Sequence, residues 1–294
     1  MQYERRIQMI DLHTHTNYSD GSWSLSRILE EAQNMGVEIL SITDHDTLKA
    51  YREMENIDYK SIYSGKIIPG IEFNTVYDGI AFHMLAYDFD YKELEKFVQE
   101  NYESKEPDLE KEFKFMMNSC KKNNIKIDNI QYDKNKGWPI DFIFPGIKKY
   151  EENKKYFKKE QWDDIDVFFN SCVTNNKFPA FVDFSIHYPN ARLVSETVKE
   201  AGGKLFIAHV YRYNLEDPIN FLNLLLQDKI IDGIEVMHSS FTKEQSKTLI
   251  DFCTEKNLLM SGGTDCHGDK KKDRKIGIGY GNMKINKELI SNWN

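Results

Sequence analysis

Short apolar runs alternate with amphipathic segments in the first and last thirds of the chain, and each pattern predicts an element. The apolar runs have the length of buried strands, whereas the amphipathic segments repeat their apolar residues with the period of a helix. Strands that alternate with helices favour a parallel α/β barrel, whose chemistry lies at the carboxyl ends of the strands. The predicted strands are residues 7–12, 37–42, 67–73, 79–87, 204–208, 233–236 and 258–261, and the predicted helices are residues 25–32, 48–57, 191–201, 218–227 and 243–257.

The middle of the chain follows a different pattern, rich in Lys, Glu, Asp and Asn with helical spacing of the apolar residues. One amphipathic stripe consists of Leu109, Phe113, Met116, Met117 and Cys120. We therefore expect a barrel domain made of residues 1–90 and 190–294, interrupted by a mainly helical subdomain of residues 91–189. The core of that subdomain is predicted to contain Trp138, Phe142, Phe144, Tyr156, Phe157, Trp162, Phe168 and Phe169.

Two histidines end the first predicted strand, and their spacing places both side chains on one face. His13 and His15 would lie about 6–7 Å apart along the strand, so that their imidazoles can converge on one metal ion. An isolated His-x-His pair is more often chance, but most other histidines here also end apolar runs beside carboxylates. The candidate ligands at or just past strand ends are His13, His15, Asp20, His45, Glu72, His83, His209, Asp265 and His267.

This set of ligands is too large for one ion, because a single ion takes about three to five protein ligands. We expect two or three divalent ions, and imidazole with carboxylate but no thiolate suits Zn, Mn or Fe. Glu72 is the natural bridge, since its carboxylate can give one oxygen to each of two ions. Asp11, Asp44 and Asp46 are expected to orient imidazoles. Cys266 faces away from the site.

Two neighbouring ions perform a recognisable kind of chemistry. They lower the pKa of a bridging water, so that hydroxide exists at neutral pH, and they stabilise charge on the attacked group. The predicted reaction is hydrolysis of a phosphate ester or, less often, of an amide. No G-x-S-x-G motif is present, and Gly202–Gly203 precedes a predicted strand, which is the wrong order for a phosphate-binding loop.

Composition narrows the class of protein. The 294 residues are 40% hydrophobic and carry a net charge of −8, which argues against a general nucleic-acid or membrane-surface binder. No apolar run approaches the roughly 18–20 residues needed to span a bilayer, and the first residues do not resemble a signal peptide. The four scattered cysteines predict neither a disulfide framework nor a thiolate zinc site. We expect a cytoplasmic protein with no stable nucleic-acid partner and an oligomeric state that the sequence does not indicate.

Several motifs occur in one order that resembles the PHP (polymerase and histidinol phosphatase) family, and specifically its stand-alone metal-dependent phosphoesterases with a helical insertion. The resemblance covers about residues 8–90 and 190–282. The motifs are Asp11–His15, Ser19–Gly21, Ile42–Thr47, Gly70–Glu72, Ala201–Gly203, Ala208–His209, Gly233–Val236 and Gly263–Gly268.

The resemblance implies a distorted (β/α)7 TIM-like barrel with a trinuclear site, in which Glu72, Asp265 and His209 take part in catalysis. It also implies a division of the ligands: His13, His15, Glu72 and Asp265 for one ion, Glu72, His83 and His209 for the second, and Asp20, His45 and His267 for the third. Close relatives act on nucleoside 3′,5′-bisphosphates, nucleoside monophosphates or short 5′-phosphorylated oligonucleotides. Two departures concern the residue after His209, which is Val210 where relatives have Pro, and Gly137–Ile140, which lacks the Arg and His that relatives carry in the insertion.

Two further residues are candidate contacts for a phosphorylated substrate. Arg212 could grip a phosphate bidentately or lie on the surface, and His238 could contact substrate or be a satisfied rim histidine. The basic run 269–275 is expected to be a solvated loop rather than a steering patch, and His187 is expected to be structural. The leading hypothesis is a phosphoesterase acting on a small nucleotide-like substrate. The alternatives are an amide or carbonyl hydrolase on the same site and a non-catalytic, metal-stabilised binding module, while an exonuclease would need a basic or aromatic strand-binding track.

Overall fold

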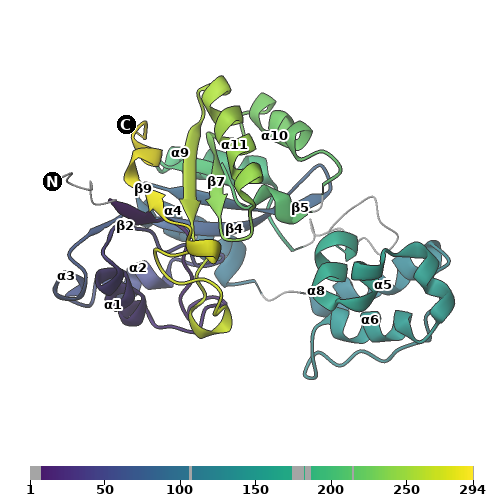
Figure 1. Ribbon diagram of the computed structural model, residues 1–294. Helices are drawn as coiled ribbons and strands as arrows, with labels where there is room; N and C mark the ends of the chain where they lie inside the picture. Colours follow the sequence, from purple (N-terminus) through teal and green to yellow (C-terminus); the bar gives the residue numbers. More distant parts are fainter. Residues whose placement is uncertain (1–7, 106–107, 174–181, 183–186, 214, 294) are drawn as a thin grey trace.

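The computed structural model describes residues 8–105, 108–173, 182, 187–213 and 215–293. Two sheets with flanking helices form one part of the molecule, and a lobe of helices lies beside them (Figure 1). Ile7, which begins the first predicted strand, lies outside the described residues. Within the described residues, no helix has both the length and the apolar character needed to cross a membrane.

The first sheet has the strand order β3-β2-β1-β9. Its strands β1, β2 and β3 are parallel, and β9 pairs with β1 in the antiparallel sense. All three residues of β1 are buried, as expected for a strand covered on both faces. The bounds are β1 (Met9–Asp11), β2 (Val37–Leu40), β3 (Lys66–Ile67) and β9 (Ile285–Asn286).

The second sheet has the order β4-β5-β6-β7-β8 and mixes both pairing senses. Strands β4 and β5 form an antiparallel hairpin, because Asp78 and Gly79 adopt positive φ angles of 49° and 71° and reverse the chain in two residues. Strand β6 is antiparallel to β5, whereas β6, β7 and β8 are parallel. The bounds are β4 (Gly70–Tyr77), β5 (Ile80–Tyr87), β6 (Lys204–Ile207), β7 (Gly233–His238) and β8 (Leu259–Gly263).

The predicted α/β class is confirmed, but the strand pairing corrects the predicted barrel. The residues that the structure describes form two mixed sheets and no closed parallel barrel. The tight turn at Asp78–Gly79 is the physical reason, since it places β5 antiparallel where a helical crossover would have kept it parallel. Backbone hydrogen bonds still join the two sheets, from the Leu12 N–H to the Gly262 carbonyl (3.2 Å) and from the Asp46 N–H to the Glu72 carbonyl (3.0 Å).

Helices cover the sheets at the predicted positions 25–32, 48–57, 191–201, 218–227 and 243–257, and two further helices, residues 59–62 and 91–98, were not predicted there. In α1 the Ser24 side chain accepts a hydrogen bond from the Arg27 N–H, and Gly36 ends the helix at a positive φ of 70°. The buried face of α1 carries Leu25, Ile28, Leu29 and Ala32. The helices around the sheets are α1 (Leu25–Met35), α2 (Lys49–Met54), α3 (Tyr59–Ile62), α4 (Tyr91–Val98), α9 (Ala191–Glu200), α10 (Pro218–Gln227) and α11 (Lys243–Lys256).

The helical lobe has its own hydrophobic core. The predicted stripe on α5 is confirmed, with Phe113, Met116, Met117 and Cys120 buried, but Trp138 is 58% exposed and does not belong to the core as predicted. It immediately precedes α6, as the N-cap residue of that helix. The helices of the lobe are α5 (Leu109–Lys122), α6 (Pro139–Lys148), α7 (Lys159–Asp163) and α8 (Ile165–Phe168).

Candidate metal centre

The Glu72 carboxylate lies at the centre of a group of imidazoles, and each of its two oxygens faces a different set. Its Oε2 atom lies 3.0 Å from His13 Nε2, 3.2 Å from His15 Nε2 and 3.5 Å from His45 Nε2. Its Oε1 atom lies 2.8 Å from both His83 Nδ1 and His209 Nε2. Glu72 is 1% exposed, so this carboxylate is buried among nitrogen ligands.

The atoms on the Oε2 side have the spacing of a metal coordination sphere. The distances from His13 Nε2 to His15 Nε2 and to Asp265 Oδ1 are 3.1 and 3.6 Å, and that from His15 Nε2 to Asp265 Oδ1 is 3.3 Å. Four ligands at about 2.1 Å from one tetrahedral ion stand about 3.4 Å apart. His13, His15 and Asp265 therefore lie close enough to share one ion, and Glu72 Oε2 adjoins both histidines.

A second set of ligands surrounds Glu72 Oε1. His83 lies on β5, and its position in the register is opposite Asn74, two residues beyond Glu72 on β4. The prediction that Glu72 and His83 end their strands is wrong, since both lie inside the β4–β5 hairpin. Pairing across the hairpin still brings the His83 ring onto the Glu72 carboxylate.

A third group lies on the far side of His15. His267 Nε2 is 2.9 Å from Asp20 Oδ2, and His15 Nδ1 is 3.6 Å from Asp20 Oδ1. His15, Asp20 and His267 can share an ion, whereas His45 groups with His15 and Glu72. The Nδ1 atoms of His15 and His45 are buried without a hydrogen-bond partner among the described residues. Such buried lone pairs suit metal coordination.

The cluster shifts the pKa values of its members in opposite directions. Burial favours the protonated acid of Glu72, but the surrounding imidazoles, including His13 and His83, outweigh it and hold the pKa of Glu72 well below its usual range. Burial also opposes the charged form of His15, yet hydrogen bonds to Asp265 and Glu72 raise its pKa to about 9. Burial dominates at His45, where it lowers the pKa to about 3. Ionised carboxylates and a neutral His45 are the protonation states that bind cations.

Sequence reasoning missed Glu235, which is fully buried in β7. Its Oε1 atom lies 2.7 Å from His13 Nδ1, and its Oε2 atom accepts a hydrogen bond from the His209 N–H at 2.7 Å. Glu235 therefore fixes the His13 ring with Nε2 facing the cluster, which is the role carboxylates take behind metal-bound histidines. An acidic residue inside the apolar run 233–236 was the sequence feature that could have identified it.

The carboxylates expected to orient imidazoles instead fix backbone loops. Asp44 accepts hydrogen bonds from Thr16 N–H (2.7 Å) and Ser19 Oγ (2.6 Å) in the loop after β1. Asp11 accepts from the N–H groups of Thr264 (2.9 Å) and Gly277 (2.8 Å). In the same way Asp46 accepts from the Asn74 N–H and side-chain amide, at 2.7 and 2.6 Å. The prediction was wrong because these side chains turn toward unpaired backbone N–H groups, which need acceptors when buried.

Close backbone approach places the ligand loops. A Cβ atom added to Gly263 would lie 2.2 Å from His13 Cβ, so only glycine lets β8 pass this close to His13. Asp46, His209 and Asp265 adopt positive φ angles of 57°, 25° and 55°. Side-chain residues in that region are strained, and such strain gathers at functional sites.

Three cationic side chains meet at Asp265, whose Oδ1 atom belongs to the tetrahedral group. Its Oδ2 atom lies 2.9 Å from Arg274 Nη1, 3.2 Å from Lys271 Nζ and 3.5 Å from Arg212 Nη1. The prediction of a solvated loop at 269–275 is therefore wrong for Lys271 and Arg274, which reach into the site. Arg274 also pairs with Asp273, at 3.1 Å, so two carboxylates face three cations, and the excess positive charge suits an additional anion.

His238 lies at the end of β7 and is buried rather than open to the rim. The Ser240 N–H donates to His238 Nδ1 at 3.0 Å, and His238 Nε2 lies 3.3 Å from Asp265 Oδ2. An acceptor at Nδ1 leaves the proton of the neutral ring on Nε2, which then faces Asp265. His187, expected to be structural, lies 3.2 Å from the Glu112 carboxylate.

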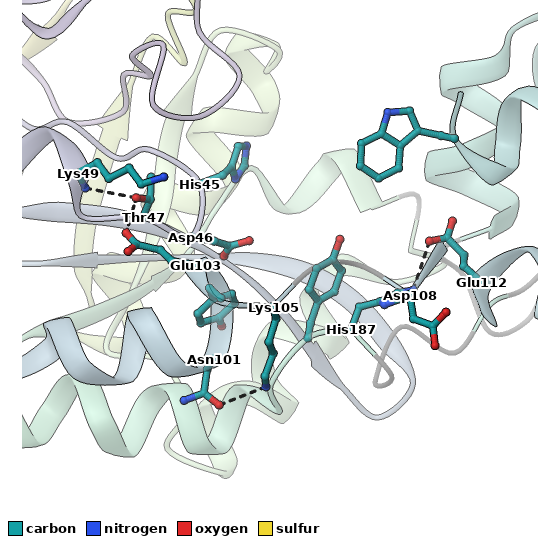
Figure 2. Close-up of a pocket in the computed structure, with 13 residues that line it drawn as sticks. His45, Asp46, Thr47, Lys49, Asn101, Glu103, Lys105, Asp108, Glu112 and His187 are labelled. Carbon is teal, nitrogen blue, oxygen red and sulfur yellow. Dashed lines mark hydrogen bonds and ion pairs between the residues drawn. The ribbon is translucent and has the colours of Figure 1, made fainter. Parts of the chain in front are cut away.

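A cavity of about 430 Å³ opens beside the cluster, between the sheets and the helical lobe. Figure 2 shows His45 and Asp46 on one side of it and His187 and Glu112 on the other. Its size falls within the range of small-molecule sites, which is about 300–1,000 Å³. The cavity therefore gives a substrate access to the His45 side of the cluster.

A comparison with known protein families assigns the chain to one of them. The PHP domain matches residues 11–162, more than half of the sequence, so the chain belongs to the PHP domain family, as its motifs predict. The metal-ligand cluster described above lies partly within this match and is completed by His209, Asp265 and His267 from the later part of the chain.

Characterised relatives cover most of the chain at low identity. A 5′-3′ exoribonuclease of Haemophilus influenzae is 26% identical over 278 residues, covering 87% of this chain and 89% of its own. A phosphoribosyl 1,2-cyclic phosphate 1,2-diphosphodiesterase of Eggerthella lenta is 24% identical over 281 residues, covering 88% and 94%. With the family match, these relatives confirm the predicted enzyme class, a hydrolase.

Solved structures share the fold. A protein from Bifidobacterium adolescentis, described as a putative metal-dependent phosphoesterase, superposes with a TM-score of 0.61 at 22% identity, covering 98% of this chain and 96% of its own. An amidohydrolase from Chromobacterium violaceum with bound sulfate gives 0.63 at 18% identity, covering 94% and 91%. At such identities the likeness concerns the fold alone.

Proposed function

We propose that the chain is a metal-dependent phosphoesterase that hydrolyses a small nucleotide-like substrate. The observation that supports this proposal is that the two oxygens of Glu72 face different imidazoles. One oxygen faces His13, His15 and His45, and the other faces His83 and His209. This is the arrangement expected of a carboxylate bridging two ions.

Two or three divalent ions, Mn, Zn or Fe, fit these ligands. Asp265 would complete the first ion, while Asp20, His267 and a histidine of the first group would hold a third. Ions bound here would act as Lewis acids and make water nucleophilic at neutral pH. Tyr213 Oη accepts a hydrogen bond from the backbone N–H of His83 (2.9 Å) and lies 3.0 Å from His209 Nδ1, so it holds the backbone at His83 and the ring of His209 for that role.

The cations around Asp265 provide the substrate side of the proposal. With Asp265 engaged by an ion, Arg212, Lys271 and Arg274 would hold the phosphate oxygens, and guanidinium groups suit this task because they donate paired hydrogen bonds. Three cations of this kind favour a phosphate ester over an uncharged amide. The names of the relatives, an exoribonuclease and a cyclic phosphodiesterase, support a nucleotide-like substrate, including a short 5′-phosphorylated oligonucleotide.

The test is phosphate or nucleotide release by the purified chain with Mn²⁺. Adenosine 3′,5′-bisphosphate, adenosine 5′-monophosphate, a 5′-phosphorylated trinucleotide and p-nitrophenyl phosphate are offered separately. We expect turnover of at least one nucleotide substrate that disappears in Glu72→Gln. Absence of turnover on all four, with bound metal demonstrated, would contradict the proposal, and turnover retained in Glu72→Gln would contradict the assigned site.

A further inference from the structure

The cavity next to the cluster has an aromatic wall that the metal chemistry does not require. His45 and Asp46 line one part of the cavity, and Trp138 of the helical lobe lines another. A substrate whose phosphate reaches the ions would therefore extend toward Trp138. The volume of about 430 Å³ is sufficient for a group larger than phosphate.

Trp138 presents its ring to the cavity instead of packing it in a core. Large aromatic side chains usually gain stability by burial, yet Trp138 is 58% exposed. The large exposed hydrophobic residues among the described part of the chain are Tyr18, Phe115, Trp138, Leu193 and Tyr280, and Trp138 is the member of this set that lines the cavity.

The backbone under Trp138 is fixed, which makes its position reproducible. Its N–H donates to Asp141 Oδ2 at 2.8 Å, and Pro139 occupies the first turn of α6. A proline at that position has its φ angle preset for a helix. The indole thus stands on a capped helix end and loses little backbone freedom when a flat ligand stacks on it.

Polar groups accompany the indole. Glu112 is 6% exposed and pairs with His187, and both line the same cavity as Trp138. Asn101 and Lys105 also line the cavity, and Lys105 Nζ donates a hydrogen bond to Asn101 Oδ1 at 3.4 Å. An aromatic surface with hydrogen-bonding groups around it matches a flat heterocycle with polar edges, whereas a plain sugar phosphate would leave the indole unused.

We propose that Trp138 stacks on the nucleobase of the substrate and makes this cavity selective for nucleotides over sugar phosphates. This inference rests on the proposed function for the phosphate end of the ligand. Stacking of a base on an aromatic side chain is sequence-tolerant, since every base has a π-face. The site would therefore accept several bases, either in a mononucleotide or at the end of an oligonucleotide.

Kinetics with paired substrates test the stacking. In Trp138→Ala the KM for adenosine 5′-monophosphate should rise about 5- to 150-fold, the range that base stacking supplies, while the KM for ribose 5-phosphate stays constant. Trp138→Phe should restore most of the effect. Phe115→Ala, a change at another exposed aromatic of the same lobe, should leave both KM values unchanged. An equal rise for both substrates, or no rise, would overturn the proposal.

A binding measurement separates this proposal from the catalytic one. Adenosine carries no phosphate to hydrolyse, so its titration into the full chain should quench tryptophan fluorescence, and ribose should not. The quenching should disappear in Trp138→Phe. If adenosine quenches through Trp138 but no substrate is hydrolysed, only the proposed function fails. If adenosine gives no Trp138-dependent quenching while phosphate release proceeds, only the stacking proposal fails.

Discussion

The sheet region buries a cluster of imidazoles and carboxylates beside its hydrophobic core, whereas the core of the helical lobe is mainly apolar. Between the sheets, Asp11, His13 and Glu235 are fully buried. In the lobe the interior consists of residues such as Ile143 and Phe168, which form an ordinary hydrophobic core. Burial of imidazoles and carboxylates is costly unless charges are compensated, whereas apolar burial is favourable by itself.

We infer from this difference that the sheet region binds the metal and that the lobe determines substrate preference. The sheet region buries charged groups that bound ions would compensate, and hydrogen bonds from backbone N–H groups to Asp11 and Asp44 hold the ligand loops. The apolar core of the lobe contains no charge for an ion to compensate, and the lobe leaves Trp138 exposed at the cavity. We therefore expect substitutions in the sheet region to weaken metal binding and substitutions in the lobe to alter substrate preference.

The largest effect is expected at Glu72. Glu72→Gln removes a bridging negative charge between two groups of imidazoles, and turnover should fall by about 10³-fold or more, with fewer ions bound per chain. Metal analysis and phosphate release are the measurements. Glu93→Gln, at an exposed glutamate of α4, is the control and should change neither quantity. A Glu72→Gln protein with its full metal content would contradict the assignment of the bridge.

Two buried glutamates compare the regions directly. Glu235→Gln loosens the His13 ring and should weaken metal affinity about 10- to 100-fold, as changes behind metal ligands usually do. Glu112→Gln, in the lobe, should leave metal affinity unaltered, although Glu112 is also buried. Competition with a metal-binding dye provides the values. Equal losses in the two variants would break the distinction between the regions.

The next prediction concerns the basic loop 269–275, whose Arg274 is expected to bind the substrate phosphate. Arg274→Met removes a charge-assisted contact of about 1.5–3 kcal/mol and should raise KM about 10- to 100-fold, with kcat less affected. Excess Mn²⁺ should not restore it, whereas excess metal should rescue Glu235→Gln. Lys272→Met, at an exposed neighbour in the same loop, is the matched control. Rescue of Arg274→Met by metal would assign Arg274 to the metal site instead.

The smallest expected effect is on the pH dependence of folding stability, measured on the protein after its metal has been removed with a chelator. Burial lowers the pKa of His45 from 6.5 to about 3 in the folded chain, so the unfolded chain binds more protons between these values. Stability from this group is therefore complete above pH 6.5 and is lost as the pH falls below it. Between pH 7.5 and 5, His45→Gln should lose about 1–2 kcal/mol less stability than the wild type, measured by denaturant unfolding. Identical pH dependence would show that His45 is not buried as a neutral ring.

Local spacing predicted part of this site, and contacts distant in sequence determined the rest. The convergence of His13 and His15 was predictable from their alternate spacing, and their Nε2 atoms lie 3.1 Å apart, although β1 ends at Asp11, before both residues. The β4–β5 hairpin was not predicted, although Asp78–Gly79 is a recognised turn pair. Hydrophobic runs do not specify whether the next strand returns directly or crosses over.

Residues that reach the site from loops were the hardest to predict. Arg274 and Lys271 stand in a run of charges that is usually solvated, and only the folded chain shows their contacts with Asp265. Glu235 lies within an apolar run and was not recognised as part of the site. Trp138 was predicted to be a core residue because its side chain is large and apolar. The direction of a side chain depends on the packing around it, which the one-dimensional pattern does not contain.

The central claim is that the two oxygens of Glu72 face two different ions. Crystals of the chain grown with Mn²⁺ and measured at an anomalous wavelength would test it directly. The account predicts a peak among His13, His15 and Asp265 and a second peak between His83 and His209, one on each side of the Glu72 carboxylate. A single peak, or peaks that leave one Glu72 oxygen without a metal neighbour, would contradict it.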